Sequence, residues 1–543
     1  MFSKNKIVQQ RIFYVSIIFL LGFFIFKNNI SENINWFLLG TSIILTTSFI
    51  ILSIKNSKKI IKEINVSRKI ILFLVLIILI SVIIRFFVFS HYLGIYMDDV
   101  MRLDAAKNIA KFNKPMICEP IFEGQKCSKI FLPIGWPFVS SIFMIFAGIS
   151  NSSIIAFSIS IGILNILLAF ILTQLLFKDE KISLLTALFF SFDKLNGLWT
   201  VSANDFNIQI FFLLATVIAY IYFLKYQKTH NGVLFITSFL LLLYTRPELS
   251  LIVIPLIFLT NFKKLKWKKE YKTVIIIFMI FLIIQILFLP TLLETQKGFR
   301  ANTLRKGLST IEVFKQQIKE VINVISFGTY YSITHLIIML IGIIFFWKKH
   351  KKEIFTLIVW MISFFVFYNL TDIKSIHKYY FVFFIPMIIL LSLGIKCLIN
   401  KIQSFKLNKK TNCFLTAFIF IIIFCSLIAN IYSTQINLKA KPILMTHLPK
   451  VLEKELPKDC YLLSGEAMAF SSLTDINAIS AFDFAEREDT IINRLQGDCL
   501  LFVDNYYCDR GKGCDYIREN YELELFSEYK HDFHEIKIYK III

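Results

Sequence analysis

Two adjacent carboxylates, Asp98 and Asp99, lie a few residues beyond an apolar run of membrane-spanning length at 70–89. Ionised side chains beside hydrocarbon are costly, so they occur mainly where a function uses them. A carboxylate in this position can act as a general base. Arg102 follows Asp98 at a spacing that puts both on one helix face. The alternative is a helix N-terminus, where the macrodipole favours aspartate and Asp98 forms a surface ion pair with Arg102.

A second acidic position, Asp205, follows another apolar run at 182–200. Together, Asp98 and Asp205 are able to hold a divalent cation such as Mg²⁺ or Mn²⁺, or Asp205 shapes the site of an acceptor molecule. The alternative is a structural role, in which Asn204 or Asp205 caps the helix that follows.

Two further segments contribute basic groups. Arg246-Pro247-Glu248 interrupts a long apolar stretch, and Lys378-Tyr379 begins a late one. The planar guanidinium of arginine binds phosphate through two parallel hydrogen bonds, and a lysine ammonium offsets charge on a departing phosphate. The alternatives are a structural Arg246–Glu248 pair at a helix break and interfacial anchoring by Lys378 and its aromatic neighbour.

The composition predicts a polytopic α-helical membrane protein. Of the 543 residues 56% are hydrophobic, and the mean hydropathy is +0.67. Runs such as 70–89, 274–290 and 414–431 approach or reach the roughly 20 apolar residues that span a bilayer. The formal charge of +22 is concentrated in short loops. Such loops are typical of the cytoplasmic side of a membrane protein, so the charge does not indicate nucleic acid binding.

Alternation of these basic loops predicts about thirteen transmembrane helices and a cytoplasmic N-terminus. The expected spans are 12–27, 34–54, 70–89, 153–177, 182–200, 206–225, 232–246, 249–261, 273–290, 332–347, 353–370, 378–399 and 412–432. Residues 131–149 contain two prolines and a glycine and lack basic flanks, which favours a juxtamembrane or re-entrant helix over a further span. The segments expected outside the cytoplasm are 91–130, 202–207, 294–331, 371–379 and the tail from 432. The loop 294–331 is basic despite this placement, through Lys297, Arg300, Arg305 and Lys306.

The pattern divides the chain into three parts. Residues 1–60 form an N-terminal transmembrane hairpin, residues 61–432 the main transmembrane domain, whose outer loop 91–130 carries the acidic pair, and residues 433–543 a small extracytoplasmic α/β domain. In the last part, strand-like runs at 461–463, 500–503, 521–526 and 535–542 alternate with helix-like runs. A multi-pass protein of the cell membrane is therefore expected, with membrane lipids as its surroundings.

Six of the nine cysteines fall in the predicted outer segments. In an oxidising compartment such cysteines can form disulfides, whereas the alternative is that all six stay reduced. Cys118 and Cys127 bracket one polar loop, and Cys508 and Cys514 bracket another. Cys460 and Cys499 each open a strand in similar sequence contexts, which makes them candidate neighbours. No CxxC motif or histidine cluster accompanies them, so a zinc site is not predicted.

The acidic pair, Ala106 eight positions after Asp98, and the proline-rich stretch 131–137 together resemble the GT-C glycosyltransferases. These enzymes use polyprenyl-phosphate sugars, and protein O-mannosyltransferases and lipid A aminoarabinose transferases belong to them. The resemblance covers roughly residues 70–400. It implies that Asp98 is the catalytic acidic residue and Asp99 its acidic neighbour. Arg102 stands where the family commonly has tyrosine, and Lys378 where it has arginine.

The resemblance implies a membrane glycosyltransferase that moves a sugar from a polyprenyl-phosphate donor, of the dolichyl or undecaprenyl type, to a protein, lipid or glycan acceptor. Asp98 is then the general base, with Arg102, Asp205, Arg246, Glu248, Lys378 and Tyr379 as substrate-binding residues. One alternative is a transporter or flippase of lipid-linked glycans, which requires ionisable residues near the membrane midplane. The other is a non-catalytic GT-C-like subunit.

Overall fold

The structure is a computed structural model. It describes residues 40, 42–57, 66–89, 91, 97–114, 116–121, 124–129, 135–202, 204–259, 333–370, 381–404, 409–440, 448–456, 460–465, 467, 470, 476–494, 499–504, 512–531 and 534–542. The predicted spans 12–27 and 273–290, the loop 294–331, and Cys508, Lys378 and Tyr379 lie outside these ranges. Asp98 and Asp99 are described in their backbone but not in their side chains.

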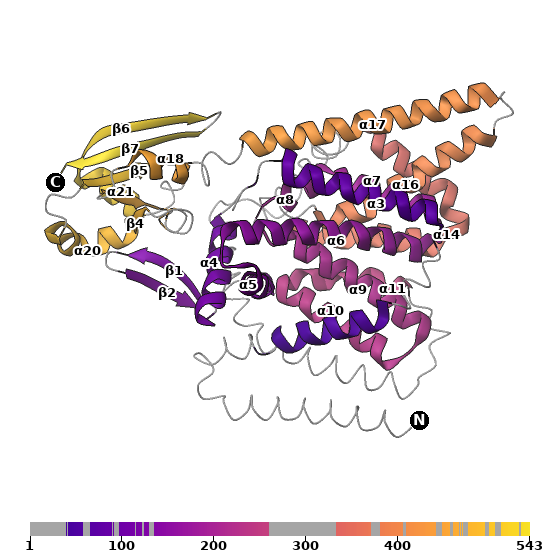
Figure 1. Cartoon of the computed structure of the whole chain (residues 1–543), viewed down its shortest axis with the longest axis horizontal. Coiled ribbons are helices and arrows are strands. Elements are labelled where there is room, and N and C mark those ends of the chain that lie inside the picture. Colours follow the sequence, from indigo (N-terminus) through magenta and orange to yellow (C-terminus); the bar gives the residue numbers. More distant parts are fainter. Residues whose placement is uncertain are drawn as a thin grey trace, which may run out of the picture.

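A bundle of apolar helices forms most of the molecule (Figure 1). Its elements are α3 (Arg68–Ile83), the π-helical turn η2 (Ile84–Val88), α6 (Asn151–Phe177), α7 (Glu180–Phe192), α8 (Lys194–Thr200), α9 (Phe206–Tyr226), α10 (Thr229–Thr245), η3 (Pro247–Ile252), α11 (Val253–Leu259), α14 (Ile333–Leu370), α16 (Phe381–Ser404) and α17 (Lys409–Ala440). Within the described ranges, 4 helices are long and apolar enough to cross a membrane: Arg68–Val88, Asn151–Phe177, Phe206–Tyr226 and Val382–Ser404. The chain is thus a helical membrane protein, and the count of about thirteen spans stays a prediction.

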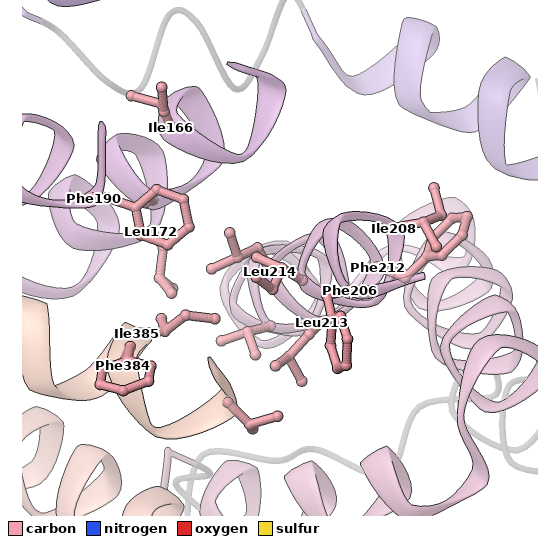
Figure 2. Packing of buried hydrophobic residues seen from close by; sticks show 14 of the residues in the cluster. Ile166, Leu172, Phe190, Phe206, Ile208, Phe212, Leu213, Leu214, Phe384 and Ile385 are labelled. Atoms are coloured by element: carbon pink, nitrogen blue, oxygen red, sulfur yellow. The ribbon is translucent and has the colours of Figure 1, made fainter. Parts of the chain in front are cut away.

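Helix α9 lies at the centre of the bundle core. Figure 2 shows its residues Phe206, Leu213 and Leu214 among large apolar side chains of other helices. These come from α6, α7 and α16, and include Ile166, Leu172, Phe190, Phe384 and Ile385. Because 78% of its most apolar window is buried inside the protein, α9 is packed against other helices over most of its surface. The N-terminal end of α9 is therefore a rigid platform for the residues that precede it.

Three predicted spans meet a break or a kink in the observed helices. The span expected over 182–200 is wrong: the chain forms α7, then breaks at Asp193, whose carboxylate caps the separate short helix α8 by accepting from the Asn196 backbone N–H at 2.9 Å. The spans expected at 332–347 and 353–370 are joined without a loop in α14, which kinks at His350. The lysines 348, 349, 351 and 352 surround this kink, where the His350 ring contacts Phe177 at the C-terminal end of α6.

The other end of the bundle carries α4 (Met97–Phe112), the hairpin β1 (Met116–Ile121) and β2 (Gly124–Lys129), and α5 (Gly135–Ala147). Cys118 and Cys127 face each other across the hairpin and form a disulfide. Helix α5 is seen nearly end-on in Figure 1, whereas α6 lies in the plane of the picture. Its 13 residues reach about 20 Å, less than the roughly 30 Å of a hydrocarbon core. The structure therefore favours a juxtamembrane helix over a span at 131–149.

The C-terminal residues form a 5-stranded sheet in the order β4-β3-β5-β7-β6. Its strands are β3 (Cys460–Ser464), β4 (Asn477–Ser480), β5 (Cys499–Asp504), β6 (Glu522–His531) and β7 (His534–Ile542), with helices α18 (Leu448–Glu455), α20 (Ala481–Arg494) and α21 (Lys512–Asn520). Strand β3 is parallel to β4 and β5, and the long hairpin β6–β7 adds antiparallel to β5. Cys460 and Cys499 are register partners on β3 and β5 and form a disulfide, and Cys514 is also disulfide-bonded. Strand β1 contacts β4, so this sheet lies beside α4 (Figure 1).

The crossing of α14 and α16 depends on two glycines. A Cβ on Gly394 would overlap the carbonyl oxygen of Ile338 and lie 2.7 Å from its carbonyl carbon, and a Cβ on Gly342 would lie 2.5 Å from the Gly394 nitrogen. We expect Gly394→Ala to lower the free energy of unfolding by about 1–3 kcal/mol, because the two backbones must move apart. Thermal unfolding of the purified protein in detergent measures this loss. Gly40→Ala is the matched control: an added Cβ there meets nothing within 4 Å, so a comparable loss in both variants would contradict the explanation.

Candidate functional site

Four charged side chains from three separate parts of the chain meet at the end of the bundle that carries α4. The Asp205 carboxylate forms ion pairs with Arg102 at 3.0 Å and with Arg246 at 3.5 Å, and Arg246 also pairs with Glu248 at 2.8 Å. Arg102, Asp205 and Arg246 are 4%, 1% and 6% exposed. We call these four residues the Asp205 cluster. All four were predicted from the sequence as site residues, and the structure brings them together.

Asp205 is available for this pairing because its neighbour caps α9. The Asn204 side-chain oxygen accepts the Phe206 backbone N–H at 2.9 Å, while Asp205 makes no side-chain cap hydrogen bond. Of the two capping alternatives, Asn204 is thus correct. The Asn204 amide also donates to the Trp199 carbonyl at 2.7 Å, which ties the turn to α8. The positive end of the α9 dipole adds to the stabilisation of the Asp205 carboxylate.

Arg246 is held between two helices by the chain geometry. Its backbone is extended (φ −158°, ψ 110°) between the end of α10 and the proline that begins η3. Its guanidinium carbon lies 5.7 Å from the centre of the Phe206 ring, a cation–π contact. The preceding turn is pressed against α5, because a Cβ on Gly135 would come within 2.7 Å of the Tyr244 carbonyl. The glycine of the proline-rich stretch therefore permits the close approach that places Arg246.

Arg102 links the cluster to α4. Arg102 is buried and pairs with Asp205, so it is not an exposed surface residue. The Asp98 side chain lies outside the described residues, so its ion pair with Arg102 stays a prediction. Its neighbours Leu103 and Ala106 are both 0% exposed, so this face of α4 is packed into the protein. Two guanidinium groups and two carboxylates give the Asp205 cluster no net charge. A neutral, mutually paired set is the form in which charges are tolerated in a buried place.

The other side of α4 is tied to the β1–β2 hairpin by residues that the sequence reasoning missed. The Asp104 carboxylate accepts the Cys118 backbone N–H at 2.7 Å and the Asn108 amide at 3.0 Å. Asn108 also donates to the Met116 carbonyl at 3.1 Å. Burial raises the pKa of Asp104, and the hydrogen bond from Cys118 opposes that rise. The only sequence signal was the spacing of Asp104 and Asn108 on one helix face.

Asp98 and Asp99 occupy the first turn of α4, which begins at Met97. Asp98 is one turn before Arg102, a rise of about 6 Å along the helix axis. The acidic pair thus begins the helix that the Asp205 cluster anchors. The positions of the two carboxylates, and of Lys378 and Tyr379, lie outside the described residues, so their roles stay predictions.

The described residues do not fit a divalent cation at Asp205. Its carboxylate already contacts two guanidinium groups, which would repel the ion. Among the residues that the structure describes, no group of three or more His, Cys, Asp or Glu is placed to hold a metal. A Mg²⁺ or Mn²⁺ ion shared by Asp98 and Asp205 stays a prediction from the sequence, and no chemical step below depends on it.

Comparisons with known proteins place the chain in a family. A family model described as "Predicted membrane protein (DUF2079)" matches residues 138–456, more than half of the chain. No curated protein matches this chain. The fold is similar to that of the archaeal oligosaccharyltransferase AglB from Archaeoglobus fulgidus, in complex with an inhibitory peptide and a dolichol-phosphate, at 13% identity over 80% of this chain and 69% of that chain, with a TM-score of 0.46.

A second similar structure is ArnT from Cupriavidus metallidurans in the apo state, at 10% identity over 86% of this chain and 97% of that chain, with a TM-score of 0.49. Both structural neighbours are GT-C glycosyltransferases. The family match rests on sequence and covers the helices α6 to α17 and the start of the C-terminal part. By that match, the chain belongs to the family of predicted membrane proteins designated DUF2079.

Proposed function

We propose that this protein is a membrane glycosyltransferase that moves a sugar from a polyprenyl-phosphate donor to an acceptor on the extracytoplasmic face. The observation that carries the proposal is the Asp205 cluster. It fixes the helix that begins with Asp98 and Asp99 to the ends of α9 and α10. A general base needs such rigid placement, because the reacting atoms must be held close together in a fixed orientation. The sequence resemblance to GT-C enzymes supports the same chemistry.

The proposed reaction is a single displacement. An acceptor hydroxyl gives its proton to the Asp98 carboxylate as its oxygen forms a bond to the anomeric carbon of the donor sugar. The bond between that carbon and the phosphate oxygen breaks, and its electron pair leaves with the polyprenyl phosphate. Cationic groups stabilise the negative charge that builds on this phosphate. Arg246, Lys378 and the basic residues of 297–306 are the proposed source of that charge.

The proposed arrangement in the membrane has about thirteen spans, a cytoplasmic N-terminus and the α/β domain at 433–543 outside the cytoplasm. The disulfides Cys118–Cys127 and Cys460–Cys499 support the placement of the β1–β2 hairpin and the α/β domain outside the cytoplasm, since such bonds persist in oxidising compartments. The lysines around His350 lie near the other end of α6, away from α5, since the His350 ring contacts Phe177. Contact between β1 and β4 puts the sheet next to α4, where it would cover the site or select the acceptor, whether protein, lipid or glycan.

The test of this function is transfer of label. Membranes that contain the full-length protein are incubated with radiolabelled polyprenyl-phosphate sugars, and the labelled product is identified. We expect label to move from the lipid fraction to an acceptor only where the protein is present. Movement of intact lipid-linked sugar across the bilayer of reconstituted vesicles, without transfer, would instead identify a flippase. Absence of both activities over a panel of donors would leave the non-catalytic subunit.

A further inference from the structure

Gln209, in the first turn of α9, has a buried side-chain amide. Its side chain is 0% exposed, and neither its amide nitrogen nor its amide oxygen has a hydrogen-bond partner among the residues that the structure describes. An unpaired carboxamide in a membrane helix is unfavourable, because neither water nor lipid replaces the missing bonds. Groups of this kind in a native protein call for an explanation, such as a partner acquired in another state of the site.

The nearest functional group along the helix is Asp205. Gln209 follows it by one helical turn, and its backbone N–H donates to the Asp205 carbonyl at 3.1 Å. Side chains four residues apart share a helix face, and helical side chains lean toward the N-terminus. A Gln and an Asp at this spacing can form a side-chain hydrogen bond. In the structure the Asp205 carboxylate is instead occupied by Arg102 and Arg246.

Arg246 cannot leave Asp205 without a cost, even though Arg102 stays paired with that carboxylate. A buried carboxylate that loses its cationic partners is strongly destabilised unless another donor satisfies it. Arg246 is also the residue that the proposed function assigns to the donor phosphate. A phosphate that enters the cluster therefore competes with Asp205 for the same guanidinium. Gln209, one helical turn after Asp205, carries an amide that can compensate that loss.

We propose that Gln209 is a positioning residue that exchanges with arginine on phosphate binding. When the anionic phosphate of a polyprenyl carrier enters, Arg246 turns from Asp205 to the phosphate oxygens. The Gln209 amide nitrogen then donates to the Asp205 carboxylate in its place. No covalent bond changes in this step. This inference rests on the proposed function and adds the device that lets a paired arginine become available to substrate.

The test separates stability from ligand affinity in Gln209→Leu. The apolar side chain removes the unpaired amide, so we expect the melting temperature of the purified full-length protein in detergent to rise without ligand. It also removes the donor that Asp205 needs in the bound state, so we expect the Kd for polyprenyl phosphate to rise about tenfold. If Gln209 were merely structural, its replacement would not raise the stability of the protein and at the same time weaken its affinity for polyprenyl phosphate.

Thr216→Val is the matched control. Thr216 lies two turns deeper on the same face of α9, and its buried hydroxyl likewise has no hydrogen-bond partner among the described residues. It is about 16 Å along the axis from Asp205, beyond hydrogen-bond reach. We expect this variant to melt at a higher temperature but to bind polyprenyl phosphate as the native protein does. A weakened affinity in Thr216→Val would overturn the assignment to Gln209.

Unchanged affinity of Gln209→Leu for polyprenyl phosphate overturns the exchange but leaves the proposed function intact. A lower melting temperature of Gln209→Leu also overturns the exchange, because it would show that bound water satisfies the Gln209 amide. If the native protein neither binds polyprenyl phosphate nor transfers sugar, the proposed function fails as well. Inorganic phosphate serves as the second ligand. If its Kd is also about tenfold higher in Gln209→Leu than in the native protein, the anion alone drives the exchange. If the variant and the native protein have equal Kd values for both ligands, the exchange is overturned.

Discussion

Asp98→Asn is expected to lower the rate of sugar transfer by at least about 100-fold, because a positioned general base contributes roughly 10² to 10⁴ in rate. Asparagine has nearly the same size as aspartate but cannot take the acceptor proton. It also keeps the preference for the first turn of a helix. The melting temperature should therefore stay close to that of the native protein. The measurement is initial transfer rate per folded molecule, with radiolabelled polyprenyl-phosphate sugar as donor.

Asp179→Asn is the control for this prediction. Asp179 caps α7 by accepting the backbone N–H groups of Lys181 and Ile182, and asparagine can do the same. It lies close enough to His350, at the α14 kink, for its charge to act on that imidazole. It has no part in the proposed reaction. The control should transfer sugar at the native rate. Native activity in Asp98→Asn would remove Asp98 from the mechanism.

Asp205→Asn is expected to give the largest loss of stability, about 3–5 kcal/mol, because it leaves buried guanidinium groups without their carboxylate. Arg246 keeps its bond to Glu248 at 2.8 Å, so the loss falls mainly on the Arg102–Asp205 ion pair. Sugar transfer should fall with it, since α4 loses its link to α9. Unfolding in detergent by denaturant, followed by tryptophan fluorescence, gives the difference in free energy.

A second variant separates lost pairing from a general folding defect. In Asp205→Asn with Arg102→Met, the Arg102 charge is removed and a side chain of similar length fills its place. We expect this double variant to recover most of the stability but not the transfer activity. A single variant within about 1 kcal/mol of the native protein would be at odds with a buried ion pair. A double variant that is less stable than the single variant would also contradict the buried ion pair.

Several features of this protein follow from local sequence signals. Long apolar runs with polar ends predicted α6, α9 and α16 within a few residues, because the cost of exposing apolar side chains acts along each helix separately. The four predicted strand segments coincide with β3, β5, β6 and β7. The short strand β4 was not predicted, since four residues carry too weak a pattern.

Other features appeared only in the folded chain. The break at Asp193 falls in the polar stretch 193–197 of a run that was expected to be one span, and α5 has the composition of a span but is too short to be one. The sequence also indicated two roles for each of Arg102, Asp205 and Arg246. Packing decided what they contact: α4, α9 and α10 converge, so Asp205 pairs with Arg102 and Arg246 from distant parts of the chain. Arg246 also keeps the pair with its sequence neighbour Glu248.

The sequence by itself determined that this is a membrane protein and which polar residues end its apolar runs, because partition between water and lipid depends on local composition. Only the tertiary structure decided which of those residues meet. Arg102 and Asp205 come from distant helices, and their contact depends on how those helices pack. The unpaired amide of Gln209 is of the same kind, since hydrogen-bond satisfaction is a property of the assembled interior rather than of a residue.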